Sequence, residues 1–158
     1  MVGPTAKTKE LDEREILVLK FWEQLLGRAK DKGVMLHAQR SPSKVFWISA
    51  GAGVRAGVSF NYVVYPHESA AELYISTKDK EENKRLFDDL RNRQAEIEQA
   101  FGGKLSWERL DEKKPCRVRC ELKEGGLKDE GKWPVIQDAM IDAMDRLAKA
   151  VKPYIARS

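Results

Sequence analysis

A glycine-rich, basic stretch, SPSKVFWISAGAGVRAG at residues 41–57, has residue types that can hold an anion. Residues 51–53, Gly-Ala-Gly, can present successive backbone N–H groups to a phosphate, with Lys44 and Arg55 adding charge nearby. The stretch lacks the Gly-Lys-Ser/Thr ending of a nucleotide-binding loop, and a predicted strand rather than a helix follows it. The structural alternative is that these small residues make a turn or bulge between two strands.

Positive charge is concentrated in the same region. Residues 28–57 contain six lysines and arginines and one acid, Asp31, whereas the net charge of the whole chain is +4. The local excess of five charges therefore exceeds the charge of the entire protein. A basic surface of this kind permits an anionic partner such as nucleic acid, without requiring one.

Two adjacent aromatic residues, Phe46 and Trp47, lie inside this basic stretch. Neighbouring residues on a strand face opposite sides, so one ring can be exposed while the other enters the core. An exposed ring beside Arg40, Lys44 and Arg55 can stack on a base while the cations hold the backbone, or it can contact a protein. We expect both rings to pack in the core, and the binding hypothesis requires that one of them does not.

Patterns that would indicate catalysis are weak. Glu121-Leu122-Lys123, with Asp111 upstream, has the form with which restriction-type endonucleases hold Mg²⁺ and position water, but these are common surface residues. His37 and His67 have no cysteine or acid at metal-ligand spacing, and the chain has no Gly-x-Ser-x-Gly elbow. We expect no catalytic residue, metal or cofactor, and we keep an Mg²⁺-dependent nuclease as the weakest alternative.

Hydrophobic periodicity predicts the elements that position these residues. Helical spacing indicates long helices over residues 9–32 and 79–102 and a third from about Pro134 to Tyr154. Alternation predicts strands near residues 46–49, 58–65, 71–76, 105–109 and 116–123. The predicted fold is α+β: an antiparallel sheet of four or five strands, with three main helices packed mostly on one face.

The opposite face of that sheet should carry polar and aromatic side chains. Strict alternation places Cys116 and Cys120 on the inner side of the last strand, where we expect buried thiols rather than a disulfide or a zinc site. The outward residues are then Asn61, Tyr65, Glu72, Tyr74, Arg117, Arg119 and Glu121. Such a face is usually solvated, but its two arginines can extend a binding surface.

Length and composition fit one soluble domain. The chain has 158 residues, 42% hydrophobic and 34% charged, which is ordinary for a globular protein. We expect the domain over residues 10–156, after a flexible polar tail at residues 1–9. No apolar run is long enough to cross a bilayer, and the start lacks the apolar middle of a signal peptide. These features predict a cytoplasmic protein without a membrane partner.

Several segments resemble a known family. The runs SPSKVFWISAGAG, GVSFNYVV, AELYISTKDKEENKRLFDDL, FGGKLSWERL and KWPVIQDAMIDAMDRL together resemble an uncharacterised prokaryotic domain, family 4268 of the DUF series, over roughly residues 16–154. In many relatives this domain is the C-terminal part of a protein whose N-terminal part looks like a restriction-endonuclease-type nuclease. The resemblance implies a link to a nuclease or defence system, and it names no activity for the domain itself.

Two non-enzymatic functions follow as hypotheses. The first, which the sequence favours, is binding of nucleic acid, DNA or RNA, through residues 28–57 and the arginines of the exposed sheet face. The second is a protein-interaction or homodimerisation module whose partner is a nuclease or another protein. Steep weakening by salt would distinguish phosphate binding from an apolar interface. The candidate binding residues are Arg40, Ser41, Ser43, Lys44, Trp47, Gly51, Gly53, Arg55, Asn61, Arg117 and Arg119.

Overall fold

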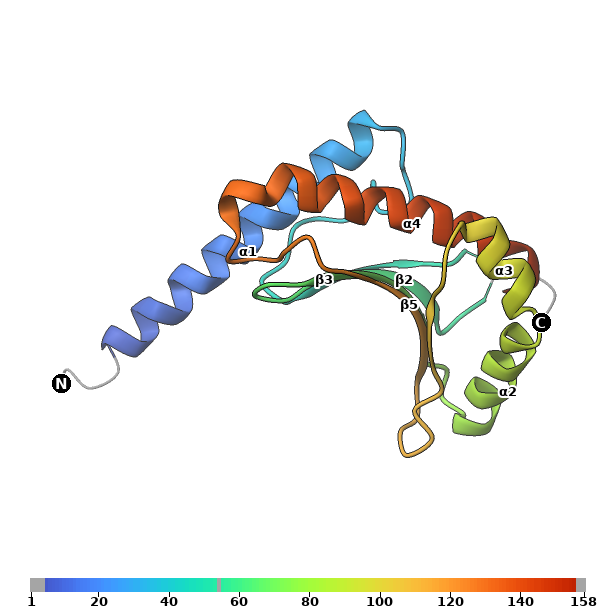
Figure 1. Ribbon diagram of the computed structural model, residues 1–158. Helices are drawn as coiled ribbons and strands as arrows, with labels where there is room; N and C mark the ends of the chain where they lie inside the picture. The colour runs from blue at the N-terminus through green and yellow to red at the C-terminus, as the bar shows by residue number, and fades with distance from the viewer. Residues whose placement is uncertain (1–4, 54, 156–158) are drawn as a thin grey trace.

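A computed structural model describes residues 5–53 and 55–155 of the protein (Figure 1). Five antiparallel strands form one sheet in the order β1-β2-β3-β5-β4. The strands are β1 (Trp47–Gly51), β2 (Val58–Val64), β3 (Ser69–Ile75), β4 (Ser106–Glu108) and β5 (Cys116–Leu122). The α+β prediction is therefore confirmed, including the number of strands.

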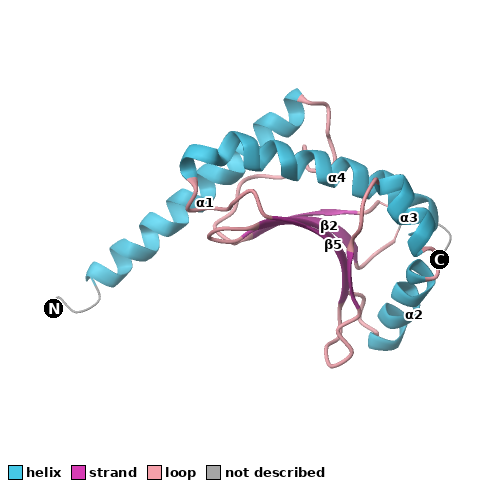
Figure 2. Cartoon of the chain, in the orientation of Figure 1, coloured by secondary structure: helices cyan, strands magenta, loops and turns pink. Residues whose placement is uncertain are grey.

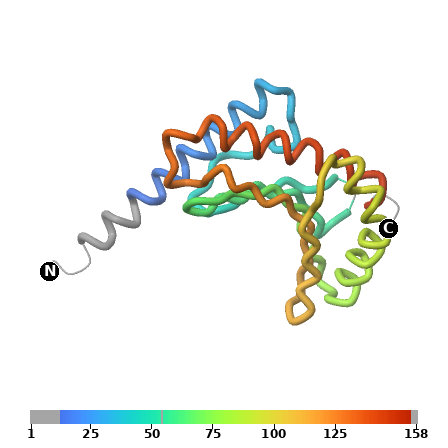
Figure 3. Tube along the Cα trace, viewed as in Figure 1, coloured from blue at the N-terminus to red at the C-terminus, as the bar shows by residue number. Residues whose placement is uncertain are grey.

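The helices cover one side of this sheet. They are α1 (Thr5–Asp31), α2 (Lys80–Arg91), α3 (Gln94–Phe101) and α4 (Trp133–Ile155), with a 3₁₀ turn at Glu130–Lys132 before α4. The sheet is bent, with the helices outside the bend and the concave side uncovered (Figure 2). Although α1 and α4 come from opposite ends of the chain, they pack side by side over the sheet (Figure 3).

Two helix boundaries differ from those expected. The first helix begins at Thr5, so residues 5–9 belong to α1, while residues 1–4 of the expected tail lie outside the described residues. The expected helix over residues 79–102 is two helices, separated at Asn92 and Arg93. The apolar stripe continues across this break, and the bend allows α3 to pack against α4. Periodicity alone does not reveal such a change of direction.

The core lies between the sheet and the helices, as the alternating pattern predicts. Phe60 and Tyr62 of β2 face the helices and are buried with Phe21 and Trp22 of α1. Cys116 is fully buried and Cys120 is half-buried, and both are free thiols. Burial raises the pKa of each thiol. Among the described residues, no helix combines the length and apolar composition needed to cross a membrane.

The expected burial of both Phe46 and Trp47 in the core is wrong. Trp47 is 51% exposed and Phe46 is 39% exposed. Ile48 takes the core position of β1, so Trp47 must face the uncovered side of the sheet. Phe46 precedes the strand, at the end of the sheet, where it borders a hollow together with Leu17 of α1. Exposure of Trp47 meets the condition that the binding hypothesis required.

Candidate binding face

The uncovered side of the sheet, here called the concave face, brings together residues from all five strands. Antiparallel register aligns them in rows that cross the sheet. The central row is polar and consists of Ser49, Asn61, Glu72, Arg119 and Ser106. The flanking rows are Trp47, Val63, Ala70 and Glu121 on one side and Gly51, Ser59, Tyr74, Arg117 and Glu108 on the other.

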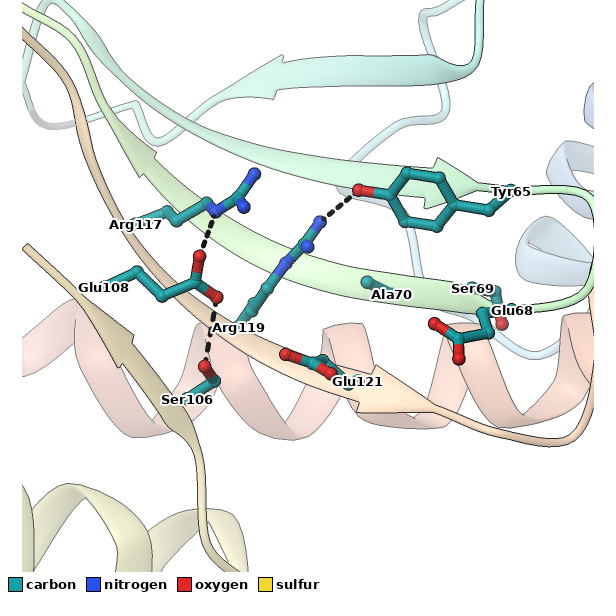
Figure 4. Close-up of a pocket in the computed structure, with 9 residues that line it drawn as sticks. All are labelled: Tyr65, Glu68, Ser69, Ala70, Ser106, Glu108, Arg117, Arg119 and Glu121. Atoms are coloured by element: carbon teal, nitrogen blue, oxygen red, sulfur yellow. Dashed lines mark hydrogen bonds and ion pairs between the residues drawn. The ribbon is translucent and has the colours of Figure 1, made fainter. Parts of the chain in front are cut away.

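A hydrogen-bonded ion pair lies at the centre of the concave face. Arg119 Nη2 donates to Glu72 Oε1 at 2.7 Å. The same nitrogen donates to the Tyr65 hydroxyl at 3.0 Å, as Figure 4 shows. Asn61 Nδ2 donates to the second Glu72 oxygen at 3.2 Å, and Ser49 Oγ donates to Asn61 Oδ1 at 2.6 Å. The side chains of Arg119 and Glu72 are only 7% and 5% exposed, although no helix covers them. Neighbouring side chains and the curvature of the sheet therefore bury the pair.

Arg119 keeps unused hydrogen-bonding capacity in this position. Burial acts to lower its pKa, but the hydrogen bond with Tyr65 and the charge of Glu72 raise the pKa above the ordinary arginine value. Its Nε is buried without a hydrogen-bond partner in the described part of the chain. A guanidinium group has five N–H donors, and here one nitrogen makes both bonds. The centre of the face is thus a fixed cation with donors to spare.

A second arginine–glutamate pair lies next to the first. Arg117 Nε donates to Glu108 Oε1 at 2.7 Å, and Ser106 Oγ donates to the other oxygen of Glu108 at 3.0 Å (Figure 4). These side chains are 30% and 21% exposed, so this pair is more accessible than that of Arg119. Each arginine on the concave face therefore already has a carboxylate partner.

Two shallow hollows divide the concave face, and their charges differ. One, of about 410 Å³, has aromatic walls from Phe46, Trp47, Tyr65 and Tyr74 and contains Glu72 as its only acid beside Arg117 and Arg119. The other, of about 370 Å³, contains the same two arginines with three acids, which are Glu68, Glu108 and Glu121 (Figure 4). The first hollow is thus aromatic with one acid beside the two arginines, and the second is polar and richer in acids, of which Glu68 and Glu121 pair with Lys123.

Comparison with known proteins identifies the family. Residues 17–155 match the family model described as Domain of unknown function (DUF4268). The chain belongs to this family. No curated protein and no solved structure matches it. The matched residues include all five strands, so the concave face lies entirely within the DUF4268 domain.

The DUF4268 domain brings together some of the residues proposed from sequence and separates the others. Trp47, Asn61, Arg117 and Arg119 line one hollow, with Gly51 in the row of Arg117. The loop before β1 holds the remaining early candidates: Arg40, Ser41 and Lys44, which are exposed, and Ser43, which is half-buried. None of these four lines either hollow.

The glycine segment serves as a turn between β1 and β2. Gly53 has φ of +81°, which glycine adopts readily, and the Ala52 N–H donates to Val58 O at 3.0 Å. That amide is therefore engaged within the sheet rather than presented to a phosphate. Arg55, within the same turn, pairs with Glu82 of α2 at 2.9 Å. The geometry fits the structural interpretation of this segment.

The basic stretch of the DUF4268 domain is largely neutralised by acids from elsewhere in the chain. Arg28 and Lys32 lie 2.8 Å and 3.5 Å from Asp138 of α4. Lys44 lies 3.8 Å from Glu15 of α1, and Arg55 has its own partner in α2. Four of the six bases in residues 28–57 are thus ion-paired with acids distant in sequence. The excess counted along the sequence does not form one free cationic patch.

Some residues of the face were not found from the sequence. Glu108 becomes part of it only because β4 pairs with β5 in the register that sets Glu108 opposite Arg117. In the sequence, the alternation around Trp107 was the signal that could have placed Glu108 on the outer side of a strand. Val63 follows from the same alternation that turns Asn61 and Tyr65 outward, whereas its pairing with Trp47 became visible only in the structure. Register depends on tertiary packing, which a single sequence does not display.

The metal and nuclease patterns do not converge in the described part of the DUF4268 domain. No group of three or more His, Cys, Asp or Glu residues there could hold a metal ion. Asp111 precedes β5 and Glu121 lies near its far end, so a strand length separates them. Lys123 approaches Glu68 at 3.0 Å and Glu121 at 4.0 Å, as ordinary surface ion pairs do. His37 is buried, and His67 contacts Asp129 at 3.3 Å.

Proposed function

We propose that this DUF4268 domain is a non-enzymatic protein-interaction module and that its concave face binds a partner protein. The supporting observation is the pairing of both arginines with glutamates beside exposed aromatic rings. Arginine and aromatic side chains are enriched in protein interfaces, whereas a polyanion favours an uncompensated positive surface. The four acids that line the two hollows would oppose a phosphate backbone laid across this face.

The two hollows specify the chemistry of the partner surface. The hollow beside Trp47 suits an apolar side chain accompanied by a carboxylate, which the spare N–H groups of the two arginines would bind. The hollow beside Glu108 and Glu121 suits a lysine or arginine. A matching partner segment would place an apolar side chain and a carboxylate in the hollow beside Trp47, and a lysine or arginine in the hollow beside Glu108. Electrostatic complementarity of this kind supports specificity.

We propose a nuclease or other defence-type protein as the partner. This part of the proposal depends on the resemblance to proteins in which a restriction-endonuclease-type part precedes this domain.

The test is a calorimetric titration of this domain with the purified nuclease-type part of a longer family member. Trp47→Ala and Arg117→Ala are each expected to weaken binding at least about tenfold. Met35→Ala and Arg40→Ala are matched controls, because these residues are exposed outside the concave face, and they should bind like the parent. Binding that is unaffected by the first two changes would exclude the concave face as the site.

Single-stranded nucleic acid is the second candidate ligand, favoured by one observation. Trp47 is exposed beside Asn61, Arg117 and Arg119, and an exposed ring on a sheet can stack on an unpaired base. A fluorescent oligothymidine titrated at about 50 mM and about 500 mM salt tests this alternative. Tight binding that weakens steeply with salt and depends on Trp47 would favour nucleic acid over a protein partner.

A further inference from the structure

The outer edge of β1 has backbone groups that no other part of the described chain uses. Val64 N–H donates to Phe46 O, and Ala52 N–H donates to Val58 O, so the even-numbered positions of β1 are bonded to β2. In an antiparallel pair the alternate residues point their N–H and C=O groups the other way. These are Trp47, Ser49 and Gly51, and no hydrogen bond to their backbone groups occurs within the described residues.

This edge also lacks the features that usually prevent pairing with another chain. The strand WISAG contains no charged residue and no proline, which commonly protect exposed edges. The flanking cations Lys44 and Arg55 are paired with Glu15 and Glu82, so little free charge opposes a second strand there. The opposite edge, β4, is only three residues long and includes Glu108. The β1 edge is therefore the open side of the sheet.

We propose that β1 pairs with β1 of a second copy of this chain, in antiparallel orientation about a two-fold axis at Ser49. Ser49 would lie opposite its own counterpart, and Trp47 opposite Gly51 of the other copy. In this register all three outward residues of each strand form hydrogen-bonded pairs with the other copy. A two-fold axis perpendicular to the sheet keeps the concave faces of both copies on one side, as one continuous sheet.

Side-chain shape supports this register. Trp47 is 51% exposed, and Gly51 has no side chain to occupy the space opposite it. A Cβ built on Gly51 would meet nothing within 4 Å, which shows that the space is open in the single chain. Each indole can therefore lie across the glycine of the other copy, as aromatic residues do beside glycines in sheets. The pairing would bury part of the most exposed aromatic ring of the described residues in each copy.

Sedimentation equilibrium of the whole chain tests the proposal, with Gly51→Val as the decisive variant. The open space around Gly51 and the β-branched side chain should leave the single chain folded. The added side chain would occupy the position of the partner indole, so we expect dimerisation to weaken more than about tenfold. Gly131→Val, at another open and exposed glycine, is the matched control and should dimerise like the parent.

Mild oxidation of Ser49→Cys gives a second measurement. Directly opposed residues of a hydrogen-bonded pair have Cα atoms about 5.5 Å apart, within the range that a disulfide spans. We expect a covalent dimer that the parent, with thiols only at Cys116 and Cys120, does not form. A parent chain that stays monomeric at high concentration, or a Gly51→Val dimer of unchanged affinity, would overturn the proposal. Neither result depends on whether the concave face binds a nuclease.

Discussion

At the scale of single residues, the Arg119–Glu72 pair dominates the concave face. Its two side chains are almost completely buried, yet they lie on the side of the sheet without helices. Charges removed from water are costly unless each keeps its partner and its hydrogen bonds. Asn61 and Tyr65 provide these additional bonds, so four side chains from three strands and a turn depend on one another. The neighbouring Arg117–Glu108 pair is more open and should matter less for folding.

Removing one member of the buried pair should therefore destabilise the fold markedly. We expect Arg119→Met to lower the free energy of unfolding by about 3 kcal/mol, because Glu72 would stay buried without its cation. Arg119→Met combined with Glu72→Leu should cost less than the sum of the single changes. Urea unfolding measures each value, with Arg117→Met as a control expected to lose about 1 kcal/mol or less. Equal losses for the two arginine variants would contradict the distinction between them.

At the scale of elements, alternation could predict which side chains share a face, but not how the strands align. Tyr74, Arg117 and Arg119 were placed correctly by the period of two in their own strands. The edge strand β1 was harder, because Trp47 and the preceding Phe46 are compatible with core or surface positions until the helices are placed. The break between α2 and α3 is likewise set by packing on α4. The sequence thus predicted the concave face as a set of outward residues, without its rows or hollows.

The loop after β5 illustrates how one element positions another. Leu127 N–H donates to Tyr65 O at 2.8 Å and Lys128 N–H to Pro66 O at 2.9 Å, which ties this loop to the β2–β3 turn. Gly126 lies in the contact: an added Cβ would overlap the Tyr65 carbonyl oxygen and lie 2.7 Å from Glu68 N. These are backbone atoms, so a small side-chain movement cannot relieve the clash. The turn that carries Tyr65 therefore requires glycine at position 126.

Gly126→Ala should separate the loop from the turn. We expect the free energy of unfolding to fall by about 2–4 kcal/mol. Because Tyr65 would move with the turn, ligand binding at the concave face should weaken even where the variant remains folded. Gly131→Ala, at a glycine with nothing within 4 Å of an added Cβ, is the control and should change stability by less than about 0.5 kcal/mol. Chemical denaturation of both variants provides the comparison, and equal stability would refute this role of Gly126.

At the scale of the whole molecule, charge could be counted from the sequence but its distribution in space could not. The basic residues 28–57 meet their acids only after α1, α2 and α4 pack around the sheet. A surplus along the chain therefore becomes a set of ion pairs dispersed over the surface. The same argument applies to proton binding, because the response of the fold to pH is the sum of all groups whose pKa changes on folding.

Those pKa changes predict a plateau of stability near neutral pH. Burial lowers the pKa of His37 from 6.5 to about 4, although a hydrogen bond to Phe60 O acts the other way. Between these values the unfolded chain binds more protons than the folded one, so stability falls as the pH falls. The carboxyl groups with lowered pKa, Asp88, Glu98, Asp129 and Asp138, add losses at still lower pH. On the alkaline side, Cys116, Cys120 and Tyr62 have raised pKa values in the folded chain. The same groups lose their protons at lower pH in the unfolded chain, so stability falls as the pH rises.

His37 alone should account for the first loss of stability as the pH falls from 6.5 toward 4. Its ring contacts Tyr62 at 4.5 Å between centroids, and Arg40 is the nearby charge that also lowers its pKa. We expect the free energy of unfolding to drop by about 2–3 kcal/mol between pH 6.5 and pH 4. His37→Gln keeps a side-chain donor for Phe60 O but does not titrate, so its profile should be flatter in this range. His67→Gln removes the other histidine, which is exposed beside Asp129, and serves as the matched comparison. Urea unfolding at half-unit pH intervals measures the parent and both variants. An unchanged slope in His37→Gln would assign the loss of stability in this pH range to other groups.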